Sequence, residues 1–318
     1  MSARPSSPLK SRVVEDCRGG YDFTPMITDP RSAVVAAIRD AGIAIDEPER
    51  IVADGKLTRF HVEGDRHGSR NGWAVLFDDA AGVAASFGHW KSGASGTWSM
   101  GHGRLTETER ARLREATAKA MRQREAERAR AAEQAAVRAV KLWSQAAQPD
   151  PAHPYLVRKK IKAHGIRQLN DRLVIPLRDA DGKLWSVEYI HRDGSKRFLS
   201  GGRKRGCYFG IGHVDPGHGE LCVAEGFATA ASIHEATGKA VAVAFDAGNL
   251  EPVARTLRAK FPGATITVCA DNDASTPGNP GLTKATAAAR AVGGYVAIPP
   301  APYNDFNDAA VADGEVVA

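Results

Sequence analysis

Residues 221–273 read LCVAEGFATAASIHEATGKAVAVAFDAGNLEPVARTLRAKFPGATITVCADND, and this stretch decides the fold of the C-terminal part of the chain. Short apolar runs at 221–224, 241–245 and 265–270 alternate with helix-like segments of ten or more residues. This alternation predicts right-handed βαβ units around a buried parallel sheet. Because ligands of such sheets bind beyond the carboxyl ends of the strands, we expect a functional site at that edge.

Carboxylates follow the predicted strands at this edge. Glu225 follows the first apolar run, Asp271 and Asp273 follow the third, and the cluster YNDFND, with Asp305 and Asp308, follows the next one. Carboxylates gathered on one rim repel one another unless cations neutralise them, and oxygen ligands suit Mg²⁺ or Mn²⁺. A lone aspartate is more often a helix cap or a solvated loop residue. The ordered set favours a metal site instead.

The order strand, Glu-Gly, helix, strand, Asp-x-Asp and a terminal NDFND element resembles the Toprim domain of bacterial primases, topoisomerases and some nucleases over roughly residues 219–310. The resemblance implies acid/base chemistry or metal ligation for Glu225 and metal binding by Asp271 and Asp273. Asp305 and Asp308 complete the expected set of metal ligands.

Three departures from the primase pattern bear on the number of bound metals rather than on the fold. Thr229 stands where primases often carry an aspartate, and Asn304 stands where a lysine usually precedes the last acidic element. The loop after Asp273, ASTPGNPG, is also long.

The 318 residues allow two or three domains with proper cores. The four cysteines contain no CxxC pair, so we expect no zinc ribbon, no bound zinc and no disulfide framework; Cys222 and Cys269 are expected in buried strands. No run of eighteen apolar residues and no signal-peptide core are found, which predicts a cytoplasmic protein without a membrane partner.

The charge is distributed unevenly along the chain. Residues 151–213 hold fourteen basic and five acidic residues, a net charge of +9, whereas 214–318 hold six basic and twelve acidic residues, a net charge of −6. A basic module joined to an acidic, metal-ready one suits a polyanion that is bound by the first and reacts at the second. A merely solvated basic surface is the alternative.

The basic module, DRLVIPLRDADGKLWSVEYIHRDGSKRFLSGGRKRGCYFGIG (171–212), reads as a β meander with Asp-Gly turns and resembles the subdomain that precedes Toprim in bacterial primases. The resemblance implies contacts of its cations with nucleotide phosphates and template, although structural ion pairs remain an alternative for any single one. The predicted binding residues are Arg158, Lys159, Lys160, Lys196, Arg197, Arg203, Lys204 and Arg205.

The N-terminal part contains EGDRHGSRNGWAVL and ASFGHWKSG, which resemble the N-terminal domain of plasmid- and phage-type Toprim primases. Its tryptophans, among them Trp73 and Trp90, alternate with cations, so they are either a stacking surface for bases or core residues. From residue 106 to 147 an Ala/Arg/Glu-rich run without Gly or Pro predicts a helix of about 60 Å.

We therefore expect a multidomain α+β protein with a Toprim α/β parallel-sheet domain at its C-terminus. The predicted parts are a disordered arm (1–27), a small α+β domain (28–104), a long helical connector (105–148), a basic β-rich subdomain (149–213) and the Toprim domain (214–318).

The combined resemblances imply a stand-alone DNA primase of plasmid or phage type, a nucleotidyltransferase that synthesises short RNA primers on single-stranded DNA from nucleoside triphosphates. Since the chain has no GxxxxGK[ST] loop, a replicative helicase would be a separate partner. Two alternatives stay open: a Toprim nuclease that cleaves DNA, and a non-enzymatic DNA-binding accessory protein of replication.

Overall fold

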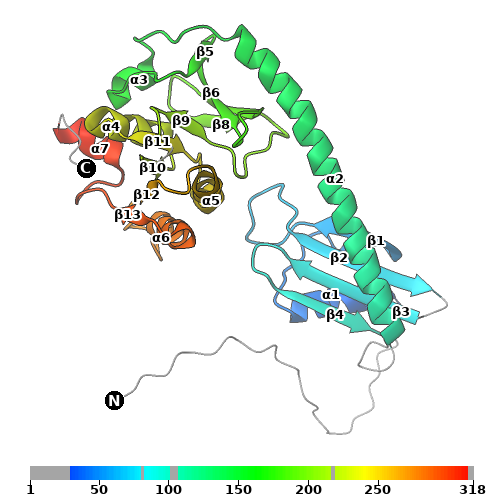
Figure 1. Ribbon diagram of the computed structural model, residues 1–318. Coiled ribbons are helices and arrows are strands. Elements are labelled where there is room, and N and C mark those ends of the chain that lie inside the picture. The colour runs from blue at the N-terminus through cyan, green and yellow to red at the C-terminus, as the bar shows by residue number, and fades with distance from the viewer. Residues whose placement is uncertain (1–28, 80–81, 101–106, 216–218, 314–318) are drawn as a thin grey trace, which may run out of the picture. The chain divides into compact units, whose positions relative to one another are not determined.

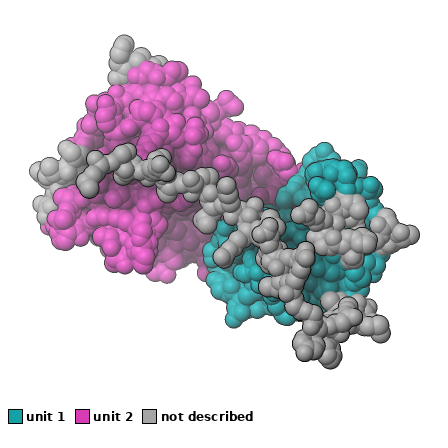
Figure 2. Space-filling view, turned by 90° about the horizontal axis from the view of Figure 1, so that it is seen from below, with its two compact units in different colours: residues 1–123 teal, residues 124–318 magenta. Residues whose placement is uncertain are grey.

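The computed structural model describes residues 29–79, 82–100, 107–215 and 219–313. The chain divides into two compact units, residues 1–123 and 124–318 (Figures 1 and 2). The expected N-terminal arm lies outside the described residues. Among the described helices, none combines the length and apolar character needed to span a membrane.

The N-terminal unit packs one helix on a four-stranded antiparallel sheet of order β1-β2-β3-β4. Asp29 caps the helix by accepting a hydrogen bond from the Arg31 N–H at 3.1 Å, and Val34 and Ile38 pack against Phe60 in the core. Its elements are α1 (Pro30–Asp40), the 3-10 turn η1 (Pro48–Arg50), β1 (Asp54–Phe60), β2 (Gly72–Asp79), β3 (Gly82–His89) and β4 (Ser95–Ser99).

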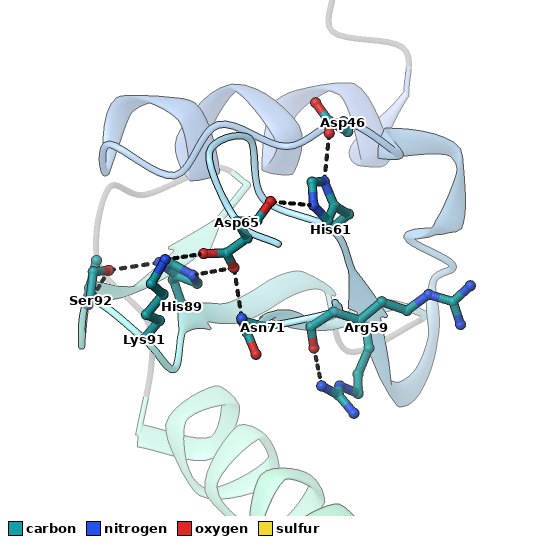
Figure 3. Close-up of polar contacts among 10 residues, drawn as sticks. Asp46, Arg59, His61, Asp65, Asn71, His89, Lys91 and Ser92 are labelled. Carbon is teal, nitrogen blue, oxygen red and sulfur yellow. Dashed lines mark hydrogen bonds and ion pairs between the residues drawn. The ribbon is translucent and has the colours of Figure 1, made fainter. Parts of the chain in front are cut away.

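A buried carboxylate fixes the loop between β1 and β2 (Figure 3). The side chain of Asp65 is only 3% exposed; it accepts hydrogen bonds from Asn71 Nδ2 at 2.8 Å and from Lys91 Nζ at 2.9 Å. His89 Nε2 lies 3.1 Å from the same carboxylate, and Ser92 Oγ lies 2.9 Å from His89 Nδ1. The hydrogen bonds from Lys91 and Asn71 hold the pKa of Asp65 well below its usual range. The ionised carboxylate of Asp65, held by these hydrogen bonds, therefore stabilises the loop between β1 and β2.

Two tryptophans of this unit, Trp73 and Trp90, pack against side chains of the same unit. The Trp73 and Trp90 rings stack with centroids 6.0 Å apart, and the Arg59 guanidinium lies 5.0 Å from the centroid of Trp90. Gly88 leaves room for Trp73, because a Cβ there would lie 2.9 Å from the indole. This arrangement favours the packing role over a stacking surface for bases.

The long helix α2 (Glu107–Gln145) has 39 residues and continues from one unit into the other. Near its start, Leu113 packs against Val75 and Ala84 of the N-terminal sheet. Near its end, Ala139 packs against Val187 in the C-terminal unit. Both ends are thus anchored by apolar contacts.

After α2, the C-terminal unit continues with a short helix and an antiparallel meander of order β5-β6-β7-β8. These elements are α3 (Pro154–Lys159), β5 (Arg167–Leu169), β6 (Arg172–Arg178), β7 (Leu184–Ile190) and β8 (Lys196–Phe198).

A five-stranded sheet of order β13-β12-β10-β11-β9 follows, with helices on both faces (Figure 1). Strands β10 to β13 are parallel, as predicted, and Cys222 and Cys269 lie buried in β10 and β12. Its elements are β9 (Phe209–Ile211), β10 (Glu220–Ala224), α4 (Phe227–Thr237), β11 (Ala240–Val243), the 3-10 turn η2 (Ala247–Asn249), α5 (Leu250–Lys260), β12 (Thr265–Cys269), α6 (Pro280–Val292), β13 (Tyr295–Ala297) and α7 (Phe306–Asp313).

Strand β9 differs from the expectation. It pairs antiparallel with β11 at the edge of this sheet, although the sequence predicts residues up to 213 in the preceding subdomain. Ile175 and Leu177 of the meander also share one core with Phe209 and Phe227. The predicted boundary at 214 therefore falls one strand too late, inside a common core.

Candidate active site

Three carboxylates meet at the C-terminal edge of the parallel strands. Glu225 directly follows β10, Asp271 comes two residues after the end of β12, and Asp305 directly precedes α7. All three line one pocket of about 390 Å³. Two backbone hydrogen bonds hold this edge together: Ala270 N–H donates to the carbonyl oxygen of Ala297 at 2.9 Å, and the Asn272 N–H donates to that of Asn304 at 2.7 Å. The fold thus fixes the acidic loops beside one another.

The carboxylates influence one another's ionisation. Burial and the charges of Glu225, Asp305 and Asp273 raise the pKa of Asp271 to about 7, and Lys196 opposes this shift. Burial and Asp246 raise the pKa of Glu225. Oδ1 of Asp271 is buried and makes no hydrogen bond within the described part of the chain. A buried oxygen without a donor suits a bound cation.

Cations also form part of the wall of this pocket. Arg158 and Lys159 come from α3, and Lys196 begins β8. The Lys159 ammonium lies 3.3 Å from the carboxylate of Asp308. Tyr155 lines the same wall, and burial raises the pKa of its hydroxyl, which keeps the hydroxyl protonated. An anionic ligand in the pocket can therefore meet both these cations and the carboxylates.

Three predicted site residues have structural partners beside the pocket. Asp273 does not line it; its Oδ2 accepts a hydrogen bond from the Gly281 N–H at the start of α6, at 3.1 Å. Asp308 meets Lys159, as described above. The Lys160 ammonium donates to the carbonyl oxygen of Val311 at 2.9 Å.

The remaining predicted cations spread over different surfaces. Arg203 lies over the Trp185 ring at 4.8 Å, and Lys204 forms an ion pair with Asp246. Arg197 is exposed on β8, and Arg205 lines a separate pocket. Of the eight predicted binding residues, Arg158, Lys159 and Lys196 line the acidic pocket.

Two charged residues near the pocket were not predicted. Asp246 comes three residues after the end of β11, so its position beyond the carboxyl end of a parallel strand was the available signal. Glu188 in the middle of β7 is 2% exposed, and burial raises its pKa to about 7 while Lys196 and Lys204 oppose the shift. The sequence feature that pointed to Glu188 was a charged residue inside the largely apolar run LWSVEYI.

Within the described ranges, no three His, Cys, Asp or Glu side chains form a ready-made metal cluster. Mg²⁺, however, keeps several waters and is usually held by one or two carboxylates together with substrate phosphates. The buried free oxygen of Asp271 and the all-oxygen donor set fit such a site.

Comparison with known proteins identifies the domain that carries the carboxylates of the pocket. Residues 220–315 match the family model of the Toprim domain. Residues 220–315 therefore form a Toprim domain.

Two curated relatives extend the similarity beyond this domain. The chain is 36% identical over 282 residues to an Escherichia coli protein named DNA primase TraC, which covers 85% of this chain and 19% of that protein. A second Escherichia coli protein of the same name is 34% identical over 286 residues, which covers 87% of this chain and 27% of that protein. The chain thus spans about a fifth to a quarter of the length of these relatives.

Among solved structures, the primase fragment of the bacteriophage T7 primase-helicase protein aligns with a TM-score of 0.39 and 17% identity, over 54% of this chain and 73% of that one. The relationship to DNA primases rests on the sequence matches.

Proposed function

We propose that the chain is a DNA primase that synthesises short RNA primers on single-stranded DNA. One observation carries this proposal: the carboxylates of Glu225, Asp271 and Asp305 line one pocket together with three cations at the edge of a Toprim sheet. Similarity over 85% of the chain to a protein named DNA primase supports it. The pocket of about 390 Å³ lies in the range of roughly 300–1,000 Å³ that is typical of small-molecule sites.

Toprim domains typically bind divalent metals, and here Asp271 and Asp305 would hold Mg²⁺ or Mn²⁺, with Glu225, Asp273 and Asp308 adjoining them. When bound, the ion supplies charge that lowers the pKa of the attacking hydroxyl and stabilises the leaving pyrophosphate. The raised pKa of Asp271 reflects its burial and then the crowded negative charge around it, and a bound cation would offset both.

The chain's own residues bind and orient the substrates. Arg158, Lys159 and Lys196 hold the triphosphate of the incoming nucleotide through charge-assisted hydrogen bonds. The 3′-oxygen of the preceding nucleotide forms a bond to the α-phosphorus as the bond to pyrophosphate breaks. Glu225 accepts the hydroxyl proton on its carboxylate, and its raised pKa makes this carboxylate a stronger base than an ordinary glutamate. Exposed cations of the meander, such as Arg197, contact the template, and a helicase would act as a separate protein.

Incorporation of labelled ribonucleotides on single-stranded DNA, with Mg²⁺ or Mn²⁺, tests the proposal. Wild type should make short, template-dependent oligomers. Asp271→Asn should make none while it still binds DNA, because it removes charge and a ligand oxygen from the pocket. Asp181→Asn, in an exposed turn, is the matched control and should retain synthesis. Cleavage of the DNA without synthesis would instead support a nuclease, and binding alone an accessory protein.

A further inference from the structure

A second, basic pocket of about 190 Å³ lies next to the carboxylate site. Its cations come from three segments: Arg205 from the loop after β8, Arg255 from α5 and Lys284 from α6. These two helices lie side by side in Figure 1. Ala247, whose backbone hydrogen bond opposes the rise in the pKa of Glu225, also lines the pocket. The turn η2 therefore contacts Glu225 and also lines the basic pocket.

The basic pocket carries uncompensated positive charge. Its one acid, Glu251, meets Nε of Arg255 at 2.8 Å. Arg205 and Lys284 form no ion pair within the described part of the chain. This charge stands out because residues 214–318 have a net charge of −6. An acidic domain repels a polyanion, so a local group of free cations on it marks a place where a polyanion can approach.

The backbone beneath this pocket is fixed by Asn249, whose side chain is buried. Its Oδ1 accepts a hydrogen bond from the Gly206 N–H at 2.8 Å. Its Nδ2 lies within hydrogen-bond distance of three carbonyl oxygens, those of Lys204 (3.2 Å), Cys207 (3.1 Å) and Ala244 (2.8 Å). The loop that carries Arg205 is therefore held against η2, where Gly248 lines the pocket.

We propose that this basic pocket binds a phosphodiester group of the nucleic-acid strand on which the active site acts, an inference that rests on the proposed function. Guanidinium and ammonium groups suit phosphate oxygens. The volume favours a phosphodiester over a nucleoside triphosphate, because pockets for whole small molecules measure about 300–1,000 Å³. A strand seated there continues past η2 to the carboxylates.

Binding of a fluorescein-labelled oligothymidylate to the full chain, followed by anisotropy at several salt concentrations, tests this inference. Each lost phosphate contact lowers the slope of log affinity against log salt by about 0.7 on single strands. Lys284→Ala should lower it by that amount, and Lys284→Ala combined with Arg205→Ala by about twice as much. Arg290→Ala is the matched control, because Arg290 is exposed on the same helix but outside the pocket.

Equal salt slopes for the double variant and wild type would overturn the inference. The same decrease in slope for the control Arg290→Ala would also overturn it. So would a raised KM for nucleoside triphosphates with unchanged strand binding, since the pocket would then serve the triphosphate. Primer synthesis by wild type is measured in parallel. If wild type makes primers but wild type and all variants show the same salt slope, the proposed role of the basic pocket is wrong and the primase assignment stands. If the variants change the salt slope as expected but wild type makes no primers, the primase assignment is wrong and the role of the basic pocket stands.

Discussion

Nδ2 of Asn307 donates a 2.8 Å hydrogen bond to the carbonyl oxygen of Lys159, and it lies 2.9 Å from Oγ of Ser232. Since Lys159 lines the acidic pocket, the terminal acidic element does more than supply Asp305. It also fastens α3, with its cations, to α4 and α7.

Asn307→Ala should therefore destabilise the C-terminal unit by about 2–4 kcal/mol, because it removes two hydrogen bonds of a fully buried side chain and leaves their partners unsatisfied. Chemical denaturation measures the cost. Asn304→Ala is the control: its side chain is exposed, only its backbone oxygen is bonded, and the change should cost less than about 0.5 kcal/mol. Similar costs for the two variants would argue against the fastening role.

Gly281 allows α6 to begin close to the acidic turn. A Cβ there would clash with the carbonyl oxygen of Asp271 and lie 3.0 Å from Oδ2 of Asp273. Gly281→Ala should cost about 1–3 kcal/mol and reduce primer synthesis, because the turn must move. Gly210→Ala, with its nearest neighbouring atom 4.0 Å away, should be tolerated in both assays. Full activity and stability of Gly281→Ala would show that the turn can shift freely.

Lys196 lowers the pKa of both Asp271 and Glu225. Lys196→Met should raise both pKa values, so that a higher pH is needed to ionise these carboxyls. We expect the acid side of the pH profile of primer synthesis to move to higher pH and the KM for nucleotides to rise. Lys183→Met, which removes an exposed lysine paired with Glu133, should leave the profile in place. A fall in rate with an unmoved profile would contradict this electrostatic role.

Glu188 makes stability depend on pH. Its pKa rises from 4.5 to about 7 on folding, so the folded state holds the proton more tightly. Its contribution to the free energy of unfolding is therefore fully present below pH 4.5. As the pH rises towards 7, the free energy of unfolding falls by roughly 3 kcal/mol. Glu188→Gln should gain stability relative to wild type over this window, as measured by hydrogen exchange of β6 and β7 amides. Glu133→Gln, on the surface of α2, should show no such trend.

Asp65 predicts the opposite pH course in the N-terminal unit. Its folded pKa lies far below the ordinary 3.8, so its stabilising effect is present above pH 4 and is lost as the pH falls through the folded pKa. Asp65→Asn should lower the melting temperature at pH 7, and the difference from wild type should shrink in acid. Asp78→Asn, an exposed residue of β2, is the control. A difference that persists unchanged at low pH would indicate lost packing rather than lost charge.

The parallel sheet and its acidic edge could be predicted because both depend on local pattern. Apolar runs place Glu225 and Asp271 at strand ends, and the carboxyl ends of parallel strands meet at the same edge. The sequence signals the burial of Glu188 only through its place in the apolar run LWSVEYI, since the burial itself depends on a layer of side chains contributed by distant segments. The run Arg203–Arg205 illustrates the same limit, because the path of a turn decides which way consecutive residues face.

The antiparallel edge strand β9 decides how this protein can be divided. A fragment beginning at residue 214 would leave the backbone of β11 unpaired along one side and would remove Phe209 from beneath α4. Bare strand edges invite pairing with other chains. Because the basic meander and the parallel sheet share one core, we expect them to unfold as one unit, and a fragment that keeps this core would have to begin upstream of α3.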